Sequence, residues 1–305
     1  MKAFIFRLFQ FALFSFLTLI IVYVSYINIK RYNLKVIPPI NFSDSYSFNK
    51  KIEFSKLKKC EVLSLGSLMT LINLDSRQVI KEFNSYEYLN LSSWGLSMKD
   101  IFRLIKIYNQ TNNFKTLVIC SNSCDFSAKN KVFSTQDVLD YLNSKNDFFY
   151  FIKKFDLKYF ISNISLANES LSGNKHYESF LMDDYGGVLL SDLNFKKREE
   201  RWSNDNITPV RKKQYDYLDS INHFCLSSKI NLYFFQTPIR KGLVNDVNKD
   251  FIEKHVIKCR QILSNKVNFV NSMDTIWNDN LFVDGTHFNK KGAEKFTKYC
   301  FDKIN

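Results

Sequence analysis

The first apolar pattern is a continuous run near the N-terminus. From Leu8 to Ile29 the chain has 22 residues without a charge, most of them Phe, Leu, Ile and Val. At about 1.5 Å per residue a helix of this length reaches roughly 33 Å, enough to cross a bilayer core. Basic residues flank both ends, so charge does not orient the segment. No small-residue cleavage site follows, and the pattern therefore predicts an uncleaved membrane anchor over residues 1–31.

Beyond residue 60 the pattern alternates between strand-like and helix-like segments. Helical spacing follows Ser97, which is placed as an N-cap with Asp100 at the third helical position. The alternation predicts an α/β fold with a parallel sheet covered on both faces and ligands at its carboxyl edge. Short β-rich runs occupy Glu61–Leu65, Glu87–Ser92, Thr116–Ser121, Ile230–Phe235 and Val267–Val270, and further helices are expected from about Pro209 to Ser227 and from Asn289 to Ile304.

Two stretches do not fit the alternation. Residues 32–59 are polar and contain Pro38-Pro39, which predicts a linker between the anchor and an α/β domain over 60–305. Residues from about 126 to 208 are rich in aromatic side chains, with a loop expected at Gly186-Gly187. This stretch is expected to be a mostly helical insertion over the strand ends, acting either as a lid or as a structural cap.

Charge and cysteine content narrow the function classes. The chain has 43 Lys and Arg against 30 Asp and Glu, a net charge of +13. The lysines are scattered, which favours biased residue usage over binding to an anionic polymer, and no nucleic-acid partner is expected. Six cysteines match no zinc or disulfide-scaffold spacing. Four of them lie in or beside apolar runs, where a free thiol behaves as a small hydrophobe.

Three candidate groups follow predicted strands. Ser67 stands on a glycine-enabled turn after the first strand, where its hydroxyl can project at the sheet edge or simply cap a helix. Gly95 can donate a backbone N–H after the second strand. Asn122 can offer a side-chain amide after the third. Gly and Asn are common in turns, so each group alone is a weak indication.

Asp284 and His287 complete the set, because they lie three residues apart on a turn before the last helix. There the carboxylate can orient the imidazole, which can act as general base to a distant hydroxyl. The other three histidines have plainer interpretations. His223 and His255 fall inside predicted helices, and His176 falls in the insertion.

Taken in order, these segments resemble the SGNH (GDSL-like) hydrolase and acyltransferase superfamily over residues 60–305. The most specific match is Asp-x-x-His before a terminal helix that contains Gly292-Ala293. The resemblance implies a flavodoxin-like three-layer parallel sheet. It also implies a nucleophile at Ser67, oxyanion donors at Gly95 and Asn122, and the rest of a triad at Asp284 and His287.

The segment Phe235–Lys241 resembles membrane-anchored members associated with surface-polysaccharide acylation. This implies a single-pass protein of the inner or plasma membrane whose domain lies outside the cytoplasm. The expected function is a serine esterase or O-acyltransferase acting on an acyl ester of a cell-surface glycan through an acyl-serine. No metal or organic cofactor is implied. The partners implied are the membrane, a polysaccharide substrate and a membrane protein that donates the acyl group.

Departures from the family pattern keep alternatives open. The first motif reads Leu65-Gly66-Ser67-Leu68, so an alignment on Gly66 would put Leu68 at the nucleophile position. The third motif reads Cys120-Ser121-Asn122-Ser123 in place of Gly-x-Asn-Asp. The main alternative is therefore a catalytically inactive glycan-binding or assembly subunit. A nucleophilic Cys120 is less favoured because it ends an apolar strand. Nucleotide binding lacks a Gly-rich phosphate loop.

Overall fold

The computed structural model describes residues 2–28, 40–43, 45–145, 147–163, 182–190, 210–244 and 246–304. They fall into two compact units, one of Met1–Asn41 with Lys154–Phe180 and one of Phe42–Lys153 with Leu181–Asn305. The first unit contains helix α1 (Lys2–Asn28). Its window Lys2–Ile21 has a mean hydropathy of 2.1 and none of it is buried. By length and composition α1 could cross a membrane, although a signal sequence meets the same criteria.

A five-stranded, all-parallel sheet forms the centre of the second unit, which confirms the predicted α/β class. The strand order is β2-β1-β3-β4-β5. Successive connections run in opposite directions from the β1–β3 pair, so this pair is the topological switch point, where doubly wound sheets bind their ligands. The strands are β1 (Val62–Ser64), β2 (Tyr88–Asn90), β3 (Thr116–Ser121), β4 (Asn231–Gln236) and β5 (Asn268–Asn271).

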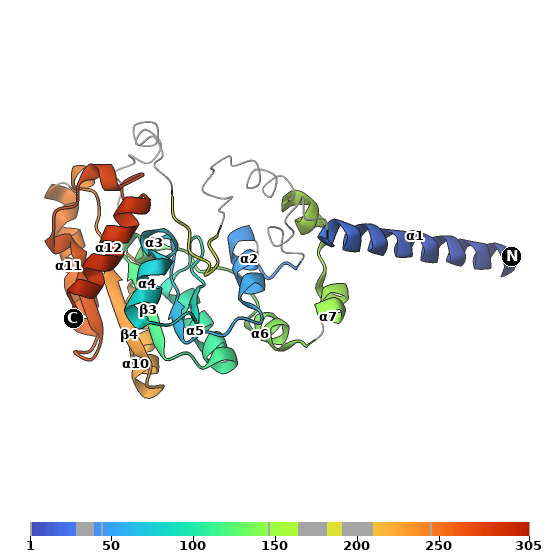
Figure 1. Ribbon diagram of the computed structural model, residues 1–305, viewed down its shortest axis with the longest axis horizontal. Coiled ribbons are helices and arrows are strands. Elements are labelled where there is room, and N and C mark those ends of the chain that lie inside the picture. The colour runs from blue at the N-terminus through green and yellow to red at the C-terminus, as the bar shows by residue number, and fades with distance from the viewer. Residues whose placement is uncertain are drawn as a thin grey trace. The chain divides into compact units, whose positions relative to one another are not determined.

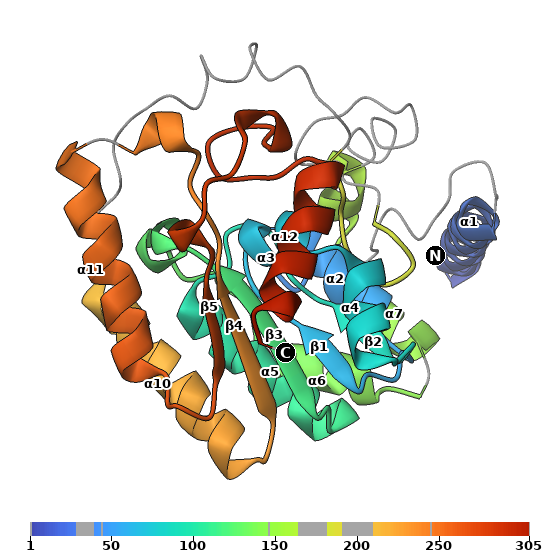
Figure 2. The same cartoon turned by 60° about the vertical axis from the view of Figure 1, so that its left-hand side comes forward.

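Helices cover both faces of the sheet (Figure 1 and Figure 2). The C-terminal helix α12 packs against α3 and α4 on one face, and α10 packs against α5 and α11 on the other. Under α12, Phe235 and Phe301 meet edge-on with ring centroids 5.3 Å apart. The covering helices are α3 (Leu68–Asn73), α4 (Ser76–Phe83), α5 (Met98–Asn112), α10 (Lys212–Ser227), α11 (Asp246–Ile262) and α12 (Lys290–Asp302).

Predicted helix ends agree with the caps in the structure. Ser97 and Asp100 form a reciprocal capping box at the start of α5. Asn289 caps α12 by accepting a hydrogen bond from the Gly292 N–H. Helix α10 begins at Lys212, and Pro209, where this helix was expected to start, lies outside the described residues.

The expected linker needs correction, because residues 46–55 form helix α2 (Tyr46–Ser55) within the α/β unit. Phe48 and Ile52 are buried on it. Asn49, Lys50, Lys51 and Ser55 are buried on it as well. This polar composition is the reason why the sequence predicted a linker. The Lys51 ammonium donates to the Asn90 carbonyl at 2.9 Å, and Asn49 is fully buried. Backbone carbonyls stabilise these polar groups inside the fold.

A truncation series tests this boundary. A chain that starts at Phe42 should unfold cooperatively, because it retains α2 and the whole α/β unit up to its C-terminus. A chain that starts at Cys60 should lose several kcal/mol of unfolding free energy, since loss of a large buried side chain such as Phe48 alone costs about 3–5 kcal/mol. Urea unfolding followed by circular dichroism measures both. Equal midpoints for the two chains would show that α2 is dispensable.

The insertion is described only in part. Helices α6 (Thr135–Asn143) and α7 (Asp147–Lys154) agree with its predicted helical character, and α6 packs against α5. Residues 182–190 return to the α/β unit: the Val188 N–H donates to Leu71 O, and the Lys290 N–H donates to Leu190 O. The remaining insertion residues, and with them the expected lid, lie outside the described part of the chain.

Candidate functional site

Ser67 occupies a tight turn between β1 and α3. A Cβ at Gly66 would lie 2.0 Å from the Thr70 hydroxyl oxygen, so only glycine permits this approach of turn and helix. Ser67 is the N-cap of α3, and its hydroxyl accepts from the Met69 N–H at 3.2 Å. The same hydroxyl donates to a carboxylate oxygen of Asp125. Leu68 is the first residue of the helix, so Ser67 supplies the hydroxyl at this turn.

Thr70 fixes α3 to the end of β3. Its hydroxyl donates to the Cys120 carbonyl at 2.8 Å and accepts from the Cys120 N–H at 2.9 Å. Thr70 is fully buried, so both bonds are shielded from water. One side chain thus sets the position of the Ser67 helix relative to the strand that leads to Asn122 and Asp125.

Asp284 and His287 form the hydrogen-bonded pair that the sequence predicts. The His287 Nδ1 and the Asp284 Oδ2 lie 2.7 Å apart, and both side chains are almost completely buried. The other Asp284 oxygen accepts from the backbone N–H groups of Thr286 and His287, each at 2.8 Å. This geometry holds the carboxylate in one orientation and presents the Nε2 edge of the imidazole away from it.

Asn73 ties this turn to the Ser67 helix. Its side-chain amide donates to the Thr286 carbonyl at 3.0 Å and accepts from the Phe288 N–H at 2.8 Å, so it contacts the backbone on both sides of His287. On the other side of the turn, the Arg240 N–H donates to the Gly285 carbonyl at 2.9 Å. Two elements distant in sequence therefore fix the Asp284–His287 turn.

Asp125 is a site residue that the sequence analysis missed. It lies on the short helix η3 (Ser123–Ser127) after β3. It accepts from the hydroxyls of Ser67 and Ser121, the latter at 2.8 Å. Burial raises the pKa of Asp125 to about 6, and the hydrogen bonds and the charge of His287 oppose that rise. The Ser67 hydroxyl therefore lies against a buried carboxylate at the switch point.

The two expected oxyanion donors have different surroundings. Asn122 directly follows β3 and is fully buried, and its amide donates to the Met69 sulfur at 3.1 Å. Thioether sulfur is a weak acceptor, so this amide remains suited to a stronger one. Gly95 lies in the loop after β2 with a φ of 64°. That loop is fixed beside Ser67, because the Ser93 N–H donates to the Gly66 carbonyl at 3.1 Å. The oxyanion roles stay predictions.

Of the remaining histidines, the two that the structure describes take no part in this site. His255 is buried on α11, where its Nδ1 lies 2.8 Å from the Tyr215 hydroxyl, and burial lowers its pKa to about 4. His223 is exposed and lies 3.5 Å from Asp219. His176 lies outside the described residues.

All six cysteines are free, and all except Cys124 are buried. Burial raises the pKa of the Cys120 thiol well above its usual range. Since the thiolate is the nucleophilic form, this position does not favour a cysteine nucleophile.

The shifted pKa values of Asp125 and His255 predict opposite pH dependences of stability. His255 binds a proton more readily when unfolded, so its contribution is complete above about pH 6.5 and is lost as the pH falls toward 4. Asp125 binds a proton more readily when folded, so its contribution is complete below about pH 3.8 and is lost as the pH rises through 6. The two effects offset each other in the intact protein.

Single substitutions should separate these two effects. As the pH increases from 4 to 6, the unfolding free energy of Asp125→Asn should increase relative to that of the unaltered protein. Over the same range, the unfolding free energy of His255→Gln should decrease relative to that of the unaltered protein. Each difference is at most about 3 kcal/mol. Urea midpoints measured across this range provide the test. Parallel pH profiles for all three proteins would contradict the assigned burial of both groups.

No three His, Cys, Asp or Glu side chains in the described ranges gather closely enough to hold a metal ion. In comparisons with known proteins, no family model matches the chain and no curated protein matches it in sequence. The case for a function therefore depends on the geometry of Ser67, Asp125 and the Asp284–His287 pair.

Proposed function

We propose that this chain is a serine esterase or O-acyltransferase that works through an acyl-Ser67 intermediate. The observation that carries the proposal is the buried Asp284–His287 pair, whose turn Asn73 ties to the helix that Ser67 caps at the switch point of the sheet. A buried, carboxylate-oriented imidazole, tied to the helix that a turn serine caps, suits the acid–base step of acyl transfer through that serine.

In the proposed reaction, the Ser67 oxygen attacks the carbonyl carbon of an ester while His287 takes the hydroxyl proton. Collapse of the tetrahedral intermediate breaks the bond to the leaving oxygen, which receives that proton from His287. Water or a second hydroxyl then attacks acyl-Ser67 by the reverse path and leaves the free serine. Asp284 holds the ring in one tautomer, and Asn122 with Gly95 would stabilise the oxyanion.

Asp125 is assigned a positioning role in this scheme. In the structure it receives the Ser67 hydroxyl hydrogen bond, so the hydroxyl must turn from Asp125 to His287 before attack. A carboxylate whose pKa is about 6 is still charged at neutral pH. It can therefore hold the serine in place and stabilise a positively charged His287 during the reaction.

The proposed substrate is an acyl ester of a cell-surface glycan, and α1 is proposed to anchor the domain on the outer side of the membrane. The support is the resemblance of Phe235–Lys241 to polysaccharide-associated members, together with an N-terminal helix long enough to span a bilayer. Labelling of Cys124 by an impermeant maleimide on intact cells tests the orientation. Labelling only after lysis would refute an extracytoplasmic domain.

A fluorophosphonate probe tests the nucleophile directly. The probe should form one covalent adduct that peptide mass spectrometry places on Ser67, because the helix N-cap position and His287 both favour serine attack. An adduct on another serine, or none at all under conditions where a control serine esterase reacts, would overturn the proposal.

One observation favours the alternative of a catalytically inactive glycan-binding subunit. The Ser67 hydroxyl donates to Asp125 and caps α3, which are the contacts of a structural serine. In that case the same edge of the sheet would bind a glycan without cleaving it. Calorimetric binding of an acylated oligosaccharide by a protein that resists the fluorophosphonate would support this alternative.

A further inference from the structure

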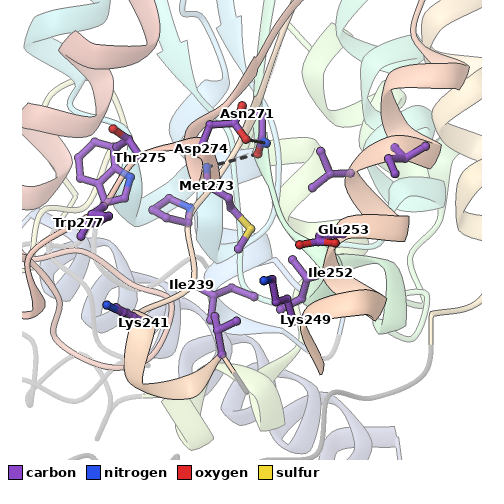
Figure 3. Close-up of a pocket in the computed structure, with 15 residues that line it drawn as sticks. Ile239, Lys241, Lys249, Ile252, Glu253, Asn271, Met273, Asp274, Thr275 and Trp277 are labelled. Carbon is purple, nitrogen blue, oxygen red and sulfur yellow. Dashed lines mark hydrogen bonds between the residues drawn. The ribbon is translucent and has the colours of Figure 1, made fainter. Parts of the chain in front are cut away.

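A pocket of about 560 Å³ lies at the carboxyl ends of β4 and β5, and none of the site residues Ser67, Asp284 and His287 lines it. Three segments line it: the loop after β4, helix α11, and the chain that follows β5. In Figure 3 the side chains of Ile239, Ile252 and Met273 gather between these segments. Its size falls within the range of small-molecule binding sites.

The lining is mostly apolar. Val256 and Trp277 add to the three apolar side chains just named. Two lysines, Lys241 and Lys249, and two acidic residues, Glu253 and Asp274, also line it. The two positive and the two negative charges balance. The pocket therefore has no net charge that would favour a phosphate or another charged ligand. The chemistry therefore favours an uncharged apolar group.

Two contacts join residues next to or on the pocket wall to the Asp284–His287 turn. Ile239 is followed by Arg240, whose backbone N–H donates to the carbonyl of Gly285 at 2.9 Å. The ring of Trp277 lies 5.2 Å from the ring of Phe288, the residue after His287. A ligand that reacts at the turn could therefore extend its apolar end into the pocket.

We propose that this pocket binds the acyl chain of the ester that Ser67 attacks, so that the substrate class is medium-chain acyl esters. This inference rests on the proposed function. Each methylene that leaves water for such a pocket improves binding by roughly four-fold. Esters with longer chains should therefore be preferred until the pocket is full.

Two measurements test the pocket separately from catalysis. A brominated dodecanoate should quench the fluorescence of Trp277 saturably, and Trp277→Phe should remove that quenching. Val256→Phe, which fills the pocket from α11, should lower the affinity for the brominated dodecanoate, as obtained from the quenching curve, by at least about tenfold. The matched control is Leu226→Phe, an apolar enlargement at an exposed position of α10, which should leave the quenching unchanged.

The second measurement compares acetyl, butyryl, octanoyl and dodecanoyl nitrophenyl esters. We expect kcat/KM to rise with chain length in the unaltered protein and in Leu226→Phe, and Val256→Phe to lose the octanoyl preference. Hydrolysis without saturable quenching, or with one rate for all chains, would overturn the pocket assignment alone. Quenching without hydrolysis of any ester would overturn the proposed function and, with it, the link between this pocket and Ser67.

Discussion

Replacement of Ser67 by Ala should abolish acyl-enzyme formation with a nitrophenyl ester, because the attacking oxygen is removed. His287→Gln should lower turnover by about 10²- to 10⁴-fold, the usual contribution of a positioned general base. Single-turnover kinetics with intact-mass detection of the acyl adduct measure both changes. A Ser67→Ala protein that still forms the adduct would show that the serine serves only as a helix cap.

Matched controls separate chemistry from folding in this experiment. Ser134 caps α6 by accepting from the Asp137 N–H at 3.1 Å, in the same way that Ser67 caps α3. Ser134→Ala and Ser67→Ala should each cost about 0.5–2 kcal/mol of stability, yet only Ser67→Ala should lose activity. His223→Gln, which changes an exposed histidine on α10, controls for His287→Gln.

The sheet and the Asp284–His287 pair could be predicted because each depends on a local pattern. Short apolar runs separated by helix-length segments can only pair as a parallel sheet with crossovers, and all five expected strands are present. Asp284 and His287 lie in one turn, so their spacing alone brings the side chains together. The capping box of Ser97 and Asp100 was predictable for the same reason.

Asp125 and helix α2 escaped prediction because their roles depend on contacts between distant segments. An acidic residue four positions past the end of a central strand was a usable signal for Asp125. Its contact with Ser67, however, joins residues 58 positions apart through the turn of η3. In α2, the apolar residues Phe48 and Ile52 have helical spacing, but lysines lie between them. The burial of Lys51 depends on the Asn90 carbonyl, which no local pattern reveals.

Asn73 makes the contact between distant segments whose loss should lower the stability most among the single substitutions proposed. Asn73→Ala removes the acceptor of the Phe288 N–H and the donor to the Thr286 carbonyl, and leaves both backbone groups unpaired beside a buried histidine. At about 1–3 kcal/mol for each of the two groups, the unfolding free energy should fall by about 2–6 kcal/mol. Asn73→Asp should lower the unfolding free energy by less than Asn73→Ala, because a carboxylate oxygen can still accept from the Phe288 N–H.

Asn73→Ala should also lower the reactivity of Ser67, because Asn73 fixes the backbone around His287 relative to the Ser67 helix. Under conditions where Asn73→Ala remains folded, the fluorophosphonate should label Ser67 more slowly, and the Phe288 N–H should exchange with solvent faster. Asn265→Ala, at an exposed position before β5, is the matched control and should change neither quantity. Unaltered hydrogen exchange at Phe288, together with unaltered labelling, would mean that the Arg240 contact with Gly285 alone holds the turn. Positioning of the imidazole would then come from the β4 side of the sheet, and the Ser67 helix could move independently of it.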